Sequence, residues 1–429
     1  MSRNHTPGTT VALLVIVVLV SVSGAWAQSS YKTLYRFKAG KDAQSPHAGL
    51  IFDTAGNLYG TTLEGGAQGA GAVFKLTRNS DGTWTETVIY SFCLDSPQCG
   101  AGRNPVAGLT SDGTGNLYGT TWHGGAGGGG VVFRLTPNPG GTWALSVLHS
   151  FCTVGPGCAD GDEPLAGVIF DAVGNLYGTT SAGGVYGPGT VFELMPKSDG
   201  SWEEKVLHSF CSVETCPGGG GGGPEARLVF DATGSLYGTT NAGGADYVGT
   251  VFELTQSRDG KWHEKVLYSF CSFCRNGSNP QAGLILDAAG NLYGTTTNGG
   301  EAGGGIVFKL TQTSGGRWKE TVLHSFCTGD CGDGYIPGGE VTSDAAGNLY
   351  GTTVGGGNLG FCPLAGCGVV YKLTPQSSGK WKETTLHVFI DRPAAYPLGS
   401  LVFDASGNLY GTAAVDGESN FGSVFEITP

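Results

Sequence analysis

Cysteines are the most numerous residues of this chain that could bind a metal or form cross-links. They occur as six close pairs: Cys93/Cys99, Cys152/Cys158, Cys211/Cys216, Cys271/Cys274, Cys327/Cys331 and Cys362/Cys367. Paired cysteines can bind zinc, but a zinc site would need two pairs to converge, and each pair lies in a different repeat. An export leader at the N-terminus favours disulfides instead. We therefore predict local disulfides, each closing a small loop and stiffening it.

Carboxylates gather in one acidic loop. Asp160, Asp162 and Glu163 surround Gly161, and clustered oxygens beside glycine suit Ca²⁺. The loop lacks full EF-hand spacing, so a solvated acidic loop is the alternative. A hydrolase would need facing carboxylates. It would draw them from six acids: Asp160, Asp162, Glu163, Glu225, Asp330 and Asp333. We expect no cofactor other than this weakly indicated Ca²⁺.

Four histidines occupy a single repeated position and are predicted to be structural. They are His149, His208, His324 and His387, and tyrosines fill the same position as Tyr35, Tyr90 and Tyr268. His47 and His123 fall outside this pattern and are better functional candidates. The sequence has no G-x-S-x-G, no H-E-x-x-H and no P-loop motif.

Aromatic and polar residues in irregular loops are the candidate ligand contacts. They are Trp122, His123, Tyr186, Tyr247, Arg275, Asn279, Tyr335 and Tyr396. Aromatic platforms beside amides and charged groups suit sugars, whose rings have apolar faces and polar edges. The alternative is that these aromatic residues cap the ends of the structural units.

The elements that position these residues come from a repeat. The phrase Gly-Asn-Leu-Tyr-Gly-Thr-Thr occurs seven times, with Ser235 and Ala413 as its departures, and successive copies lie 56 to 60 residues apart. Its central tyrosines are Tyr59, Tyr118, Tyr177, Tyr237, Tyr293, Tyr350 and Tyr410. Each repeat divides into four short segments with strand-like alternation, and turn residues separate them. In the first repeat we expect strands near 48–53, 58–62, 73–77 and 86–92. The pattern predicts an all-β, seven-bladed propeller.

The chain ends indicate how the ring closes. The last repeat stops after a third strand, 424–428, and the chain after the leader begins with a lone fourth strand, 31–37. We predict that this N-terminal strand completes the last blade, which removes an exposed sheet edge. The long, variable links between strands two and three and between blades then share one face, where function on a repeat scaffold is expected.

These repeats resemble those of the bacterial "GloVer" family of exported proteins. The GNLYGTT phrase, the glycine-rich loop and the later V-F-x-L-T carry the resemblance, which extends over about residues 31–429. It implies an exported propeller and prescribes no catalytic residues.

The remaining expectations come from composition. Arg3, an apolar run and Ala25-Trp26-Ala27 predict a cleaved signal peptide at residues 1–27, followed by one propeller domain at 28–429 with no membrane-spanning segment. The formal net charge of −12 disfavours nucleic acid as a partner. We expect a secreted or envelope protein that acts as a binding module for carbohydrate or another protein. The alternatives are a hydrolase, lyase or lactonase at the central channel and a structural surface component.

Overall fold

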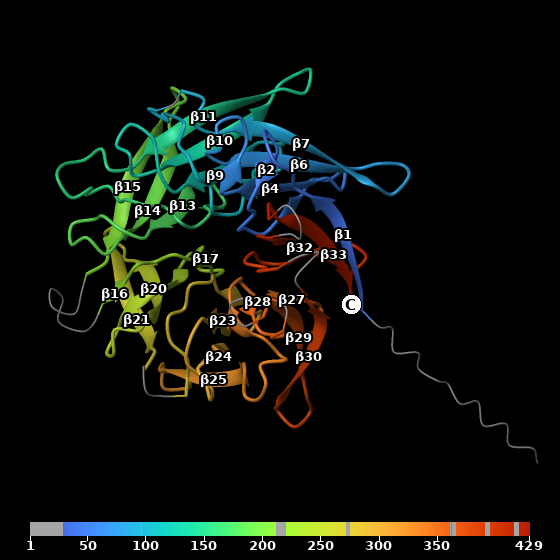
Figure 1. Ribbon diagram of the computed structural model, residues 1–429. Coiled ribbons are helices and arrows are strands. Elements are labelled where there is room, and N and C mark those ends of the chain that lie inside the picture. Colours follow the sequence, from blue (N-terminus) through green and yellow to red (C-terminus); the bar gives the residue numbers. More distant parts are fainter. Residues whose placement is uncertain are drawn as a thin grey trace, which may run out of the picture.

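The computed structural model describes residues 29–95, 97–211, 220–271, 275–360, 362, 366–390, 395–415 and 420–429. The predicted signal peptide and both Cys216 and Cys274 lie outside these residues. All regular elements in the described ranges are strands, and they form seven antiparallel sheets. Figure 1 shows these sheets arranged in a ring, so the predicted seven-bladed propeller is confirmed.

Each blade has four strands in sequence order, numbered outward from the axis. Blade one contains β3 (Ile51–Phe52), β4 (Leu58–Thr62), β6 (Ala72–Arg78) and β7 (Trp84–Ser91); blade two β8 (Thr110–Ser111), β9 (Leu117–Thr121), β10 (Val131–Pro137) and β11 (Trp143–Ser150); blade three β12 (Ile169–Phe170), β13 (Leu176–Thr180), β14 (Thr190–Pro196) and β15 (Trp202–Ser209). Blade four contains β17 (Val229–Phe230), β18 (Leu236–Thr240), β20 (Thr250–Gln256) and β21 (Trp262–Ser269); blade five β22 (Ile285–Leu286), β23 (Leu292–Thr296), β24 (Ile306–Gln312) and β25 (Trp318–Ser325). Blade six contains β27 (Thr342–Ser343), β28 (Leu349–Gly355), β29 (Val369–Pro375) and β30 (Trp381–Val388); blade seven β31 (Val402–Phe403), β32 (Leu409–Ala413), β33 (Ser423–Thr428) and β1 (Ser30–Arg36).

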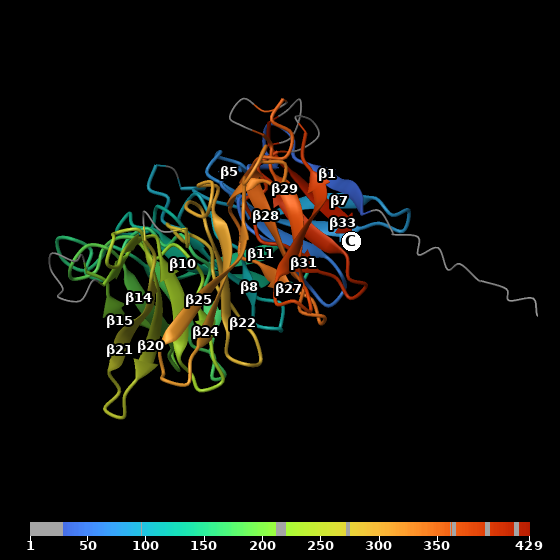
Figure 2. The ribbon, with the colours of Figure 1, turned by 90° about the horizontal axis from the view of Figure 1, so that it is seen from below.

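The N-terminal strand closes the ring as predicted. β1 pairs antiparallel with β33, with Tyr31 opposite Ile427 and Lys32 opposite Glu426. The two strands lie side by side in both views, blue against red (Figures 1 and 2). Phe37 follows β1, is fully buried and packs against Phe74 of the first blade. The closing strand therefore joins the last blade to the first.

The innermost strands are shorter than expected. In blade one the strand covers Ile51–Phe52 rather than residues 48–53, because its ladder with β4 comprises two residue pairs. The preceding Ala48-Gly49 segment instead lies against its neighbours around the axis. A Cβ on Gly49 would come within 2.9 Å of the Ser400 carbonyl oxygen. Three short additional elements cover the blade ends: β2 (Ala43–Gln44) with β5 (Glu64–Gly65), β16 (Gly221–Gly222) with β19 (Ala242–Gly243), and β26 (Tyr335–Pro337) with β28.

The repeated phrase is explained by packing. In blade one a Cβ on Gly60 would lie 2.6 Å from Cζ of Phe74, so glycine is needed beneath the fully buried ring. The Thr61 hydroxyl donates a hydrogen bond to the Ala107 carbonyl of the next blade at 2.7 Å. Asp53 accepts hydrogen bonds from the Asn57 amide and the Tyr59 hydroxyl, which fixes the turn between the first two strands. The phrase is therefore structural.

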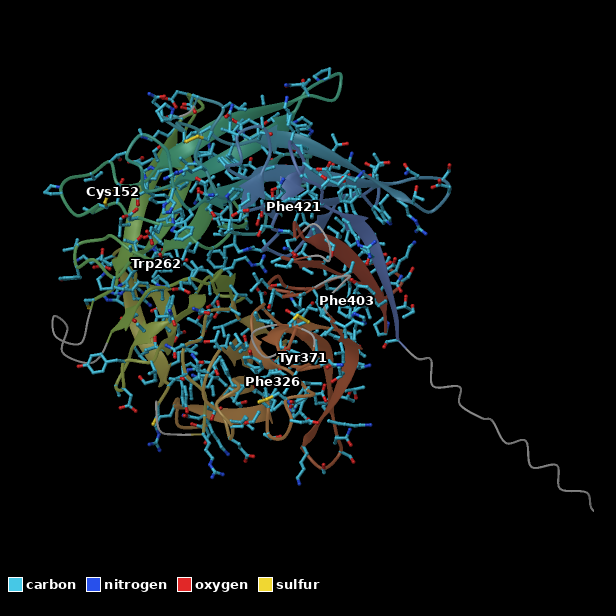
Figure 3. All side chains as sticks on the ribbon, viewed as in Figure 1. Cys152, Trp262, Phe326, Tyr371, Phe403 and Phe421 are labelled. Carbon is cyan, nitrogen blue, oxygen red and sulfur yellow. A yellow bond between two sulfur atoms is a disulfide. The ribbon has the colours of Figure 1, made fainter. Side chains whose placement is uncertain are left out.

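The core is divided among the interfaces between blades. Each buried cluster combines the third strand of one blade with strands of its neighbour; Phe326 of blade five, for example, packs edge-on against Tyr371 of blade six with ring centroids 5.0 Å apart (Figure 3). Burial of these large rings drives association of the blades. The result is a rigid ring whose inner strands line a central space.

Candidate functional site

The inner segments of all seven blades line a central cavity of about 550 Å³. Each segment begins at the proline that precedes the first strand, and its next residues face the cavity. Small residues are required here because the segments nearly touch. A Cβ on Gly167 would lie 2.7 Å from the Gly108 carbonyl oxygen. This agrees with the expectation that Ala-Gly pairs line a crowded axis.

The lining is not equivalent in the seven blades. At the third residue after the proline, blades one, two, three and five have glycine, whereas blades four, six and seven have Arg227, Glu340 and Ser400. The sequence analysis missed these residues. A comparison of the seven repeats at this position would have found them, because polar side chains interrupt a glycine position.

Arg227 and Glu340 form an ion pair within the cavity. The guanidinium nitrogen lies 3.3 Å from the carboxylate oxygen, and Ser400 Oγ accepts a hydrogen bond from the Glu340 backbone at 3.1 Å. Burial raises the pKa of Glu340, and the Arg227 charge opposes this rise. The pair reaches past Gly283 of blade five, where a Cβ would come within 2.7 Å of a Glu340 oxygen. Arg227 remains half exposed, so its guanidinium can contact a ligand.

Additional polar groups lie at the start of the inner segments. The Asn241 amide donates a hydrogen bond to Glu225 at 3.1 Å. Burial raises the pKa of Glu225, while hydrogen bonds from Asn241 and Gln281 lower it. In blade one, Ser45 lies 3.3 Å from Nε2 of His47, and burial lowers the pKa of that histidine. His47, one of the two non-repeated histidines, thus lines the cavity.

The opposite part of the lining is apolar. Blades two and three contribute Val106 and Leu165 at the positions that Glu225 and Gln281 fill in blades four and five. Blade seven adds Leu398. The cavity therefore has a polar side, with acceptors and donors, and an apolar side.

The rim of the cavity is held by unusual backbone geometry. The residue before each conserved-position proline has a positive φ, between 57° and 61°: Ser45, Asn104, Glu163, Gly223, Asn279, Ile336 and Tyr396. Six of these are not glycine, so the conformation costs energy that the surroundings must offset. Their N–H groups donate to carbonyls of the preceding blade, as Asn279 does to Val248 at 2.7 Å. This network fixes the rim between neighbouring blades.

The predicted ligand contacts surround the cavity without lining it. Asn279 and Tyr396 belong to the rim, and Tyr335 lies near Tyr396. Trp122 and His123 stack on one another with ring centroids 4.4 Å apart. Three others lie in outer loops: Tyr186 and Tyr247 are more than half exposed, and Arg275 has an exposed side chain. Their contact with a ligand stays a prediction.

The acidic loop is organised by its own hydrogen bonds. Asp160 is buried and accepts hydrogen bonds from Thr153 and from the Val154 backbone. Burial, followed by the Glu163 charge, raises the pKa of Asp162. Within the described residues, these three acids do not converge as a set of metal ligands. Of the six acids considered for a hydrolase, Glu225 alone lines the cavity.

Disulfides form locally, as predicted. Four are fully described: Cys93–Cys99, Cys152–Cys158, Cys327–Cys331 and Cys362–Cys367. Cys211 and Cys271 are also disulfide-bonded. Cys152 lies in an outer loop (Figure 3). Disulfides are compatible with an extracellular or envelope location. The part of the chain that the structure describes contains no helix long and apolar enough to cross a membrane.

The repeated histidines pack at the outer interfaces between blades. His208 lies against Phe210, and its Nε2 is 3.6 Å from a Glu264 oxygen of the next blade. Burial lowers the pKa of His208 to about 4 and raises that of Glu264. His387 stacks on Tyr31 of the closing strand, with ring centroids 3.9 Å apart. These contacts agree with the predicted structural role.

The buried histidine gives a prediction about pH. Because the pKa of His208 is below its unfolded value of 6.5, its contribution to stability is complete above pH 6.5 and is lost as pH falls toward 4. His208→Tyr should remove this loss, so the variant should gain up to about 3 kcal/mol relative to wild type between pH 6.5 and 4. Urea unfolding at several pH values measures this difference. His263→Tyr, at an exposed position, is the control, and parallel curves for H208Y and wild type would contradict the prediction.

Comparisons with known proteins agree with the architecture. The Gloeobacter/Verrucomicrobia repeat model matches residues 22–158, 144–362 and 264–429, so the chain belongs to this repeat family. No curated protein matches the sequence. A proposed 6-phosphogluconolactonase from Bacteroides uniformis is similar in structure, with a TM-score of 0.51 and 12% identity over 89% of this chain and 92% of that one. An ancestral GH74 enzyme has a TM-score of 0.55 and 11% identity over 91% of this chain and 48% of that one. At these identities the likeness concerns the fold alone.

Proposed function

We propose that the protein is a recognition module that binds a neutral carbohydrate in its central cavity. The observation that carries the proposal is the division of the lining into a polar side with Glu225, Gln281 and Arg227 and an apolar side with Val106 and Leu165. Sugar rings have the same division between C–H faces and hydroxyl edges. Carboxylates accept hydrogen bonds from hydroxyls, and the amide and guanidinium groups donate them.

The dimensions of the cavity support the proposal. About 550 Å³ falls within the range of small-molecule sites, roughly 300–1,000 Å³. Its charged groups are two glutamates and one arginine, which favours a neutral ligand over an anionic one. The fixed rim lowers the entropic cost of binding, because few groups must be ordered.

Hydrolysis is the second candidate function. Glu225 and Glu340 both line the cavity, and burial raises the pKa of each. A carboxyl group with a raised pKa can serve as a general acid near neutral pH. Product analysis by chromatography after incubation with oligosaccharides separates this candidate from binding alone.

A thermal-shift screen of neutral oligosaccharides, with and without Ca²⁺, tests the proposal, and calorimetry follows for each hit. Glu225→Gln with Gln281→Leu should weaken binding at least about tenfold, because hydrogen bonds to a charged acceptor contribute roughly 1.5–3 kcal/mol. The matched control is Glu301→Gln, a glutamate outside the cavity. Equal affinity in the cavity double variant and wild type would contradict the assigned site.

A further inference from the structure

A second cavity, of about 340 Å³, lies between blades four and five on the face with the short turns. Asp231, Tyr237 and Glu253 of blade four form one wall, and Asn291, Gln312 and Trp318 of blade five form the other. The rings of Tyr237 and Trp318 meet edge to face, 6.5 Å apart. The cavity thus combines two carboxylates with two aromatic rings.

Blade four lacks a donor that the other blades have. In the other six, an asparagine amide donates to the turn aspartate at 2.6 to 2.9 Å, as Asn291 does to Asp287 at 2.7 Å. Ser235 occupies this position in blade four and bonds to Asp231 through its backbone N–H at Oδ1. The amide donor to Oδ2 of Asp231 is therefore missing.

Blade four also has an additional acceptor. Glu253 replaces the lysine of blades one, five and six, and its Oε1 lies 3.0 Å from the Tyr237 hydroxyl. The same hydroxyl lies 3.2 Å from Oδ2 of Asp231. One hydroxyl proton cannot satisfy both carboxylates. Lys265 lies 3.6 Å from the other Glu253 oxygen, but its side chain is largely exposed. In blade three, Asn175 supplies amide hydrogen bonds to both acids, so the deficit does not arise there.

Three sister blades show what can fill such a space. Lys75, Lys309 and Lys372 place their ammonium groups over the rings of Tyr59, Tyr293 and Tyr350, at 5.3 to 5.5 Å from the ring centroid. An ammonium group supplies three donors and a positive charge, which are the properties that the blade-four cavity lacks. The chain's own lysines therefore act as internal models of a ligand.

We propose that the cavity between blades four and five binds a primary alkylammonium group, such as a lysine side chain of a partner. The ammonium would donate to Asp231 and Glu253, and its alkyl chain would lie along Trp318. Hydrogen bonds from Thr233 and the Ser235 backbone outweigh burial and lower the pKa of Asp231, so its carboxylate is charged at neutral pH. A Ca²⁺ ion would need six to eight oxygen ligands, and no such group of acids converges among the described residues.

The test measures binding of the n-butylammonium ion to the purified protein by saturation-transfer NMR at low salt, with n-butanol as the neutral control. Glu253→Lys with Lys265→Thr reproduces the Lys309/Thr321 pair of blade five and places an internal ammonium in the cavity. This double variant should keep the wild-type melting temperature and bind butylammonium at least about tenfold more weakly. Ser235→Asn, which restores the amide donor, should weaken binding by a smaller factor.

Glu193→Lys with Lys205→Thr makes the same change in blade three and should leave affinity unchanged. Three results would overturn the proposal: no saturable binding by wild type, equal binding by the E253K/K265T variant, or displacement of butylammonium by Ca²⁺ at equimolar concentration. The carbohydrate proposal concerns a different cavity, so its failure would not affect this result.

Discussion

Deletion of residues 29–38 is expected to abolish the cooperative unfolding transition. The deletion removes β1, leaves β33 with an unpaired edge and exposes the cavity that Phe37 fills between blades seven and one. Loss of a buried phenylalanine alone costs about 3–5 kcal/mol, and total domain stability is roughly 5–15 kcal/mol. Differential scanning calorimetry should show a broad transition or none. A sharp transition at the wild-type temperature would contradict ring closure by β1.

A circular permutant is the matched control for this deletion. Residues 29–38 can follow Pro429 through the hairpin 79–83 of blade one, because Ser30 faces Thr428 as Thr85 faces Thr77. The strand then joins blade seven by the connection used in the other six blades. The permutant should recover cooperative unfolding. If the permutant also fails to fold, the order of the chain rather than the missing strand would explain the deletion.

Replacement of Arg227 by glycine is expected to destabilise the protein by about 1–3 kcal/mol at pH 7. Removing one member of a buried ion pair costs roughly 3–5 kcal/mol, and the half-exposed Arg227 reduces that figure. Arg227 stabilises the charged form of Glu340, so its loss should matter above the raised pKa of that carboxyl and disappear as acid protonates it. Chemical unfolding at pH 7 and at about pH 4 measures the difference. A pH-independent loss would contradict the role of the ion pair.

The double variant Arg227→Gly with Glu340→Gly separates charge from packing. It restores the glycine that blades one, two, three and five have at this position. Since neither charge remains, its stability should return to within about 1 kcal/mol of wild type. Glu340→Gly alone should cost less than Arg227→Gly alone, because a half-exposed arginine stays hydrated. The reverse order would show that Glu340 acts mainly by packing.

The sequence contains enough information to predict the ring. The repeated phrase recurs because Gly60 must lie beneath Phe74 and Asp53 must accept from Asn57 and Tyr59, and these constraints apply within one blade. Closure follows from the strand missing at one end and present at the other. Such local constraints leave a visible period. The length of the inner strands could not be predicted, because packing around the axis, rather than β-propensity, ends their ladders.

The candidate site could be predicted less well. Loop aromatics such as Tyr186 and Tyr247 are conspicuous in the sequence, yet they lie away from the cavity. Arg227 and Glu340 are 113 residues apart, and the ring geometry brings them together across blade five. Their signal was a departure from glycine at one repeated position. The acids of the loop at Asp160 formed a cluster in sequence, but their hydrogen bonds serve the loop itself.

A crystal structure of the protein with the best neutral oligosaccharide from the screen tests the central claim most directly. The account predicts sugar density in the central cavity, with hydroxyls bonded to Glu225, Gln281 and Arg227 and a ring face against Val106 or Leu165. Sugar bound instead at the outer loops near Tyr186 or Tyr247, with an empty cavity, would contradict it.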